Sequence, residues 1–119
     1  MTKSELARAY LEKASKRQRV LQVLVEEAAW SDVVREAQEL VELALKGMLR
    51  EVGIDPPKWH DVGPILLQQA RLFPNEIQSH LHELARISKW LRKEREFSFY
   101  GDIDFIPRNN TRKKTATEP

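Results

Sequence analysis

The sequence predicts an all-α fold: an antiparallel up-down four-helix bundle followed by a C-terminal tail that is largely irregular or disordered. Apolar residues recur at helical spacing through most of the chain, and no strand-type alternation persists long enough to predict a sheet. The prolines cluster between the periodic segments, so the connections between helices are short, as in antiparallel bundles. We therefore expect one helical domain over residues 1–107 and a basic, flexible tail over residues 108–119.

The first helix is predicted to start after Thr2 and to end near Glu27 or Ala28. Thr2 and Glu5 fit a capping box, in which each residue satisfies a free backbone donor of the other. The apolar residues that follow define one broad buried face. They are Leu6, Ala7, Tyr10, Leu11, Ala14, Leu21, Leu24 and Val25.

The second helix is predicted from a cap at Ser31 or Asp32 to a left-handed stop at Gly53. Its apolar residues cover more than one stripe, which indicates a central position in the bundle. Gly47 is unfavourable inside a helix by about 1 kcal/mol relative to alanine, so we expect it to permit a close helix crossing. The apolar set is Val33, Ala37, Leu40, Val41, Ala44, Leu45, Met48, Leu49 and Val52.

The third helix is predicted to be short, with Asp61 as its cap, and the fourth to run from about Pro74 to Glu96. The fourth helix carries a core stripe made of Ile77, Leu81, Leu84, Ser88 and Leu91. Continuing this stripe by three or four residues places Arg92 and Arg95 on or beside the buried seam. In contrast, Arg86, Lys89 and Lys93 are expected to point outward.

After the fourth helix, Gly101–Asp102 predicts a turn. The apolar residues on either side of it are expected to fold back on the bundle; they are Phe99, Tyr100, Phe105 and Ile106. The tail that follows is locally basic, although the net charge of the whole chain is only +2. We expect a solvated, disordered end, with contact to phosphates as the alternative.

Two groups of polar residues are candidates for function. Gln38, Glu42 and Lys46 are spaced four apart on the second helix, either as an ordinary surface row with a Glu42–Lys46 pair or as the wall of a cleft. Arg92 and Arg95 require anions if they lie near the core. These anions are either internal carboxylates, such as Glu42 or Glu96, or a bound phosphate, which suits the planar guanidinium.

The composition excludes several other classes of function. No stretch of about 18 apolar residues is present, so we expect no membrane span. With no cysteine and no secretory signal, we expect a cytoplasmic protein. The sequence has no glycine-rich phosphate loop and no Ser-His-Asp arrangement, and we expect no cofactor. His80 and His82 are two apart on a helix and predict no metal site, while His60 is expected to bond a helix end or the backbone.

The chain contains three characteristic segments: AQELVELALKGMLREVGIDPPKWHDVG at 37–63, LRKEREFSFYGD at 91–102 and FIP at 105–107. Together they resemble the HEPN domain family (higher eukaryotes and prokaryotes nucleotide-binding). The resemblance implies an antiparallel helical bundle that usually dimerises. It also implies a minimal nucleotidyltransferase encoded beside it, in some cases as a toxin and antitoxin pair. Many members are metal-independent endoribonucleases.

The family signature is an Arg followed after four to six residues by a His, with a Tyr two residues further on in some members. Here Arg92 matches the Arg and Tyr100 matches the Tyr, but Ser98 stands at the position of the His. RNA cleavage without a metal needs a group that accepts the 2′-hydroxyl proton. Serine cannot serve, and a tyrosine with an unperturbed pKa of about 10 is a poor base. His60 could substitute only if its loop folds beside the fourth helix.

The resemblance therefore implies a cytoplasmic homodimer that binds nucleotide or RNA phosphate and pairs with a nucleotidyltransferase. We expect Arg92, Arg95 and Tyr100 to form the reactive wall of the site. The opposite wall is expected to contain Gln38, Glu42, Lys46 and His60. Two alternatives are an endoribonuclease with a non-standard base and a helical oligomerisation domain without a ligand.

Overall fold

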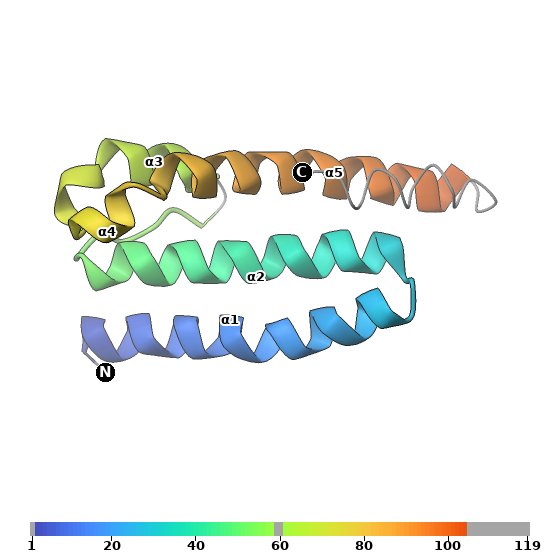
Figure 1. The fold of residues 1–119 in the computed structure, drawn as a ribbon, viewed down its shortest axis with the longest axis horizontal. Coiled ribbons are helices and arrows are strands. Elements are labelled where there is room, and N and C mark those ends of the chain that lie inside the picture. Colours follow the sequence, from blue (N-terminus) through green and yellow to red (C-terminus); the bar gives the residue numbers. More distant parts are fainter. Residues whose placement is uncertain (1, 59–60, 105–119) are drawn as a thin grey trace.

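The computed structural model describes residues 2–58 and 61–104, and most of these residues are helical (Figure 1). Three helices are long: α1 (Lys3–Glu26), α2 (Trp30–Glu51) and α5 (Leu81–Asp104). Between α2 and α5 lie three short helical pieces: α3 (Gly63–Gln68), the 3₁₀ turn η1 (Ala70–Leu72) and α4 (Asn75–Gln78). No helix in the described part of the chain is long and apolar enough to cross a membrane.

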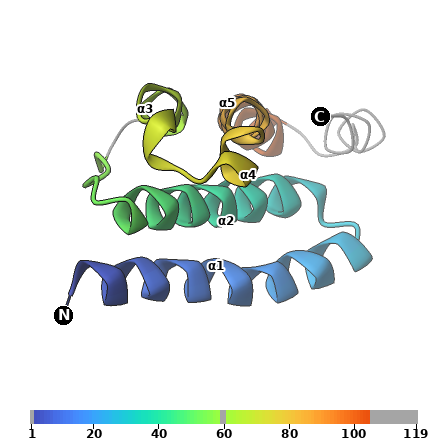
Figure 2. The same ribbon diagram turned by 60° about the vertical axis from the view of Figure 1, so that its left-hand side comes forward.

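The helices are arranged in layers with α2 in the middle. Figure 2 shows α1 on one side of α2, and α3 and α5 on the other side. Both α1 and α5 pack along α2, and α3 packs mainly against α5. The all-helical fold is therefore confirmed. The four-helix up-down bundle is not confirmed, because short pieces stand where that bundle has its third helix.

The start of α1 and the end of α2 agree with the sequence. The Thr2 hydroxyl accepts the Glu5 N–H at 3.0 Å, and the Glu5 carboxylate accepts the Thr2 N–H at 3.3 Å, which completes the capping box. At the end of α2, Gly53 has a φ of +86°, and the Ile54 N–H donates to the Leu49 carbonyl at 2.9 Å. This 6→1 bond is the Schellman ending expected at a left-handed glycine.

The predicted cap of α2 is wrong, because α2 begins before it, at Trp30. The chain reverses between α1 and α2 within a few residues, with Ala28 at a φ of +55°. The Ala29 N–H bonds back to the Leu24 carbonyl at 3.0 Å, and Ala29 itself is the N-cap without a side-chain bond. The reversal, and not a capping side chain, therefore decides where the helix starts.

The crossing of α1 and α2 at Gly47 is as close as the sequence predicts. Gly47 is buried, and a Cβ atom placed on it would lie 3.0 Å from Cγ of Leu11 and 3.2 Å from Cβ of Tyr10. Carbon atoms normally pack about 3.5–4.0 Å apart. Glycine therefore allows α1 to approach α2 at this point.

The predicted fourth helix is interrupted near its start and continues beyond its expected end. A turn at Ser79–His80 separates α4 from α5, and the Ser79 hydroxyl donates to the Glu76 carbonyl at 3.1 Å. At the other end, α5 continues through Gly101–Asp102, so the turn predicted there is wrong. A glycine opposes a helix by only about 1 kcal/mol, which the rest of a long helix can offset. Residues 105–119, including the predicted tail, lie outside the described residues.

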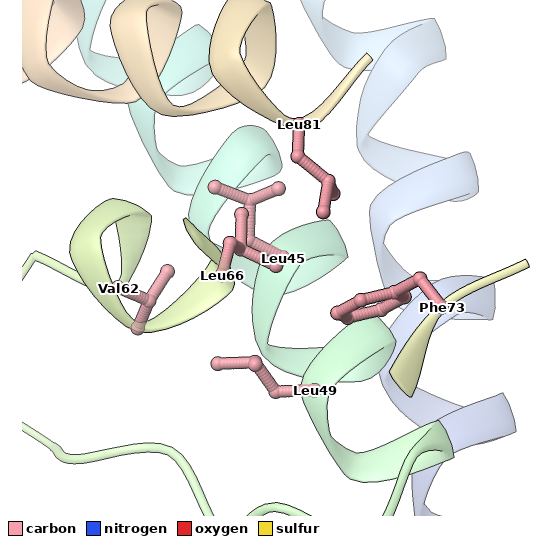
Figure 3. Close-up of a cluster of buried hydrophobic side chains, with 6 residues drawn as sticks. All are labelled: Leu45, Leu49, Val62, Leu66, Phe73 and Leu81. Carbon is pink, nitrogen blue, oxygen red and sulfur yellow. The ribbon is translucent and has the colours of Figure 1, made fainter. Parts of the chain in front are cut away.

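The apolar core lies at one end of α2, where the short helices cover it (Figure 3). Its buried side chains come from α2, from the segments around α3 and η1, and from the start of α5. They are Leu45, Leu49, Val62, Leu66, Phe73 and Leu81. Further along α2 and α5, beyond this cluster, buried apolar side chains such as Val34 and Leu91 are accompanied by polar side chains.

Candidate functional site

The polar half of the contact between α2 and α5 is built around two arginines. Since the two helices are antiparallel, residues that precede the core on α2 face residues that follow it on α5. Arg92 Nη1 donates to Glu42 Oε1 at 2.7 Å. Arg95 Nη1 donates to Gln38 Oε1 and, at 3.0 Å, to Glu39 Oε1. The expected internal pairing is therefore present, with Glu42 as the partner of Arg92.

Gln38 connects the two arginines. Its side chain is 3% exposed, although it is polar. Its Nε2 donates to Glu42 Oε2, while its Oε1 accepts from Arg95. A chain of hydrogen bonds thus runs from Arg95 through Gln38 and Glu42 to Arg92. We call these residues, together with Glu39, the arginine network.

Toward the described residues, each arginine keeps most of its donors. A guanidinium has five N–H donors on three nitrogens, and the bonds of Arg92 and Arg95 to described residues involve only Nη1. Both side chains are more than one third exposed. The carboxylates and the amide therefore hold the two guanidinium groups in place and leave Nε and Nη2 available to a ligand.

A pocket of about 770 Å³ lies beside the arginine network. The described residues of its lining include five basic and three acidic side chains, so their charge is positive overall. The lining consists of Arg35, Gln38, Glu42, Asp61, Lys89, Arg92, Lys93, Arg95 and Glu96. Lys89 and Lys93 are exposed, as predicted, and they nevertheless border this arginine pocket.

Asp61 belongs to the pocket, but its predicted role as the N-cap of the third helix is wrong, because Val62 is the N-cap of α3. The Oδ1 of Asp61 still accepts the Gly63 N–H, the first backbone donor of α3, at 3.0 Å. The same oxygen accepts the hydroxyl of Ser88 on α5 at 2.9 Å, and Ser88 is 2% exposed. These bonds fasten the loop before α3 to α5 and bring a carboxylate to the pocket. The sequence offers no signal for this, because Asp61 and Ser88 are 27 residues apart.

Lys46 does not join the arginine pocket. It lies eight residues after Gln38, and at 3.6 residues per turn this separation rotates it by about 80° around the helix. Lys46 instead lines a second hollow between α1 and α2. The carboxylate of Glu42 is bound by Gln38 and Arg92, and within the described residues Lys46 forms no ion pair.

Arg35 and Glu39 are site residues that the sequence interpretation missed. Arg35 precedes Gln38 by three residues, so the same helix face includes it. Residues three or four positions from Gln38 lie on the same helix face, and this rule would have predicted Arg35 as a site residue. The prediction used steps of four residues only, and two such steps from Gln38 reach Lys46. Glu39 pairs with Arg95 at side-chain exposures of 40% and 39%.

Three predicted positions have no described side chain. Ser98 and Tyr100 lie in the final turns of α5, after Arg95, where the structure describes the backbone. His60 lies outside the described residues, directly before Asp61 in the sequence. In the part of the chain that the structure describes, no three His, Asp or Glu side chains form a group that could hold a metal ion.

Comparison with known proteins identifies the family. A family model of the HEPN domain matches residues 7–118, a span that includes α2, α5 and both arginines. No curated protein and no solved structure matches the chain significantly. Because the family match covers nearly the whole sequence, the chain belongs to the HEPN domain family.

Proposed function

We propose that this protein binds phosphate groups of a nucleotide or an RNA in the arginine pocket. We further propose that it is the HEPN partner of a minimal nucleotidyltransferase in a toxin-antitoxin-like pair. Family membership supports a function related to nucleotides or RNA. The observation that carries the proposal is the pair of guanidinium groups, Arg92 and Arg95, held by α2 at the wall of a positively charged pocket.

The arginine network favours phosphate binding because it orients the donors in advance. Ordering a long side chain on binding costs about 0.5–1.5 kcal/mol, and an arginine already held at Nη1 has part of that ordering in place. A planar guanidinium also matches two oxygens of one phosphate. Lys89, Lys93 and Arg35 add positive charge around the two arginines.

The proposed pairing with a nucleotidyltransferase gives Tyr100 a role as the residue that the partner modifies. The matching Tyr is modified in some pairs that resemble this one. An adjacent nucleotidyltransferase gene is the expected observation. Joint purification of the two proteins, followed by mass spectrometry of Tyr100, tests the modification. An unmodified Tyr100 after incubation with the partner and ATP would remove this part of the proposal.

The proposal includes a homodimer, which apolar surface on α1 supports. Val20, Val23 and Val25 are 49%, 55% and 44% exposed. On α5, Phe97 is 63% exposed. These segments of α1 and α5 lie toward the same end of the molecule (Figure 1). Sedimentation equilibrium should give a dimer, and a monomer at high micromolar concentration would contradict it.

Ligand-dependent melting tests phosphate binding directly. ATP, AMP and short RNAs should raise the melting temperature, because a ligand at 100 times its Kd adds about 2.7 kcal/mol to the free energy of unfolding. Arg92→Gln and Arg95→Gln should lose most of this effect. If ATP, AMP and RNA at millimolar concentration all leave the melting temperature of the native protein unchanged, the proposal fails.

Arg86→Gln is the matched control, since Arg86 lies on α5 but outside the pocket lining. Arg86 Nη2 bonds Glu83 Oε1 at 2.6 Å, and this hydrogen bond holds the pKa of the Glu83 carboxyl below its usual range. The control therefore removes the same charge and a comparable ion pair. It should leave the ligand response intact, and an equal loss in the control would mean that the effect is one of general charge.

A further inference from the structure

A second hollow of about 540 Å³ lies between α1 and α2. It is next to the arginine pocket, because Glu42 lines both. Glu39, which binds Arg95, lies in the wall of the second hollow. The lining consists of Leu6, Ala9, Tyr10, Glu12, Lys13, Lys16, Glu39, Glu42, Leu43 and Lys46. Glu39 and Glu42 thus form a ridge on α2 between the two spaces.

Among the described residues, three lysines in this hollow have no acidic partner in an ion pair. Lys13 and Lys16 are three apart on α1 and exposed, and Lys46 faces them from α2. Within residues 2–58 and 61–97, none of the three forms an ion pair. Of the acids in the hollow, Glu39 and Glu42 already bind arginines of α5, which leaves Glu12 as the nearby countercharge.

The two hollows form one positively charged face across three helices. Counted over the described residues, the two linings together contain eight basic and five acidic side chains. Packed helices lie about 8–10 Å apart, so α1 and α5, on opposite sides of α2, are about 16–20 Å apart. The phosphate groups of a single nucleotide lie too close together to reach both ends of this face. A strand with several phosphates can do so.

We propose that the ligand is a single-stranded RNA and that its backbone continues from the arginine pocket over the α2 ridge to Lys13, Lys16 and Lys46. The three lysines then form a second phosphate subsite. Apolar side chains in the same hollow, Leu6, Tyr10 and Leu43, offer a surface for a base; the Arg50 guanidinium, 5.0 Å from the centroid of the Tyr10 ring, covers one face of that ring. A basic groove with an aromatic side chain is the usual arrangement for binding single strands. This inference rests on phosphate binding in the arginine pocket and names its substrate class.

The test compares a strand with a mononucleotide. The probe is a labelled oligouridine of about 12 nucleotides, within the roughly 4–16 that one single-strand-binding module covers, and the second ligand is ATP. The variant is Lys13→Gln/Lys16→Gln/Lys46→Gln. It should bind the strand about tenfold more weakly and bind ATP as the native protein does. The slope of log K against log salt should become shallower by about 2, because each phosphate contact on a single strand contributes about 0.7.

The matched control is Lys3→Gln/Arg8→Gln/Arg19→Gln, which removes three charges from exposed positions of α1 outside both hollows. It should bind the strand nearly as well as the native protein. Equal losses in the two triple variants would overturn the inference, as would unchanged strand binding in the hollow variant. A polyglutamate peptide that binds with the same dependence on the three lysines would assign the hollow to an acidic protein instead.

The outcomes separate this inference from the proposed function. If ATP binds and the strand binds no more tightly than ATP, the inferred second subsite is contradicted, while the proposal of phosphate binding in the arginine pocket is retained. If neither ligand binds the native protein, both proposals fail. Circular dichroism of each triple variant checks that the helices are retained.

Discussion

Replacing Gly47 with alanine tests the close crossing of α1 and α2. Two effects of opposite sign compete at this position. Alanine favours a helix over glycine by about 1 kcal/mol, which alone would stabilise the protein. The new methyl group, however, would lie 3.0 Å from Cγ of Leu11 and 3.2 Å from Cβ of Tyr10.

The Tyr10 contact decides the expected sign. The Leu11 side chain is 38% exposed and can rotate away from a methyl group. The Cβ of Tyr10 is bonded directly to the α1 backbone, so only a shift of the whole helix can relieve that contact. Overpacking of this kind costs about 1–3 kcal/mol. We therefore expect Gly47→Ala to lower the free energy of unfolding by about 1 kcal/mol, since the propensity gain offsets part of the cost.

Urea denaturation followed by far-UV circular dichroism measures this difference. The pair Ser15→Ala and Ser15→Gly is the control for helix propensity, because Ser15 is exposed in the middle of α1. The alanine variant should be more stable than the glycine variant by about 1 kcal/mol, without any packing term. In a Leu11→Ala background, most of the penalty of Gly47→Ala should remain, because the contact with Cβ of Tyr10 is unchanged. If Gly47→Ala stabilises the native protein by about 1 kcal/mol, the crossing is not close and the reasoning is refuted.

Two further predictions concern the polar contacts around the pocket. Gln38→Leu should lower the free energy of unfolding by about 1.5–3 kcal/mol, because Glu42 and Arg95 both lose a hydrogen-bond partner at a buried position. A urea denaturation midpoint equal to that of the native protein would show that the arginine network is not formed. Asp61→Ala should cost about 1–3 kcal/mol because it leaves the buried Ser88 hydroxyl unpaired, whereas Asp61→Asn keeps an acceptor and should cost much less. ATP titration should show tighter binding to Asp61→Asn, since a negative charge leaves the pocket; equal stability and equal affinity of the two variants would contradict this account.

Stability alone gives a weak reason for the arginine network. The Arg92–Glu42 and Arg95–Glu39 pairs are partly exposed, at 37% with 20% and 39% with 40%. Ion pairs exposed to solvent contribute about 0–1 kcal/mol. Apolar side chains across the same helix contact would stabilise it at least as well. Orienting two guanidinium groups toward the pocket is a role that apolar side chains cannot perform.

Local sequence signals predicted helix ends where the residue types themselves favour the end. The capping box at Thr2 and the left-handed stop at Gly53 are of this kind, and both are confirmed. The predicted cap at Ser31 or Asp32 failed because the reversal at Ala28 had already started the helix. The bonding at this reversal is equally local, since the Ala29 N–H bonds to the Leu24 carbonyl, but an alanine gives no sequence signal for a positive φ.

The sequence by itself determined that the chain is helical and that Gly47 marks a close crossing. For Arg92 and Arg95 it left internal carboxylates, such as Glu42 or Glu96, and a bound phosphate as alternatives, and the structure identifies Glu42 as the partner of Arg92. The sequence predictions follow from periodicity and from the need of a charge near the core for a countercharge. Only the tertiary structure decided that Lys46 lies in the hollow toward α1 and that Asp61 reaches the arginine pocket. The physical reason is that the helix packed against each side of α2, and the path of a loop against α5, are set by contacts between segments distant in sequence.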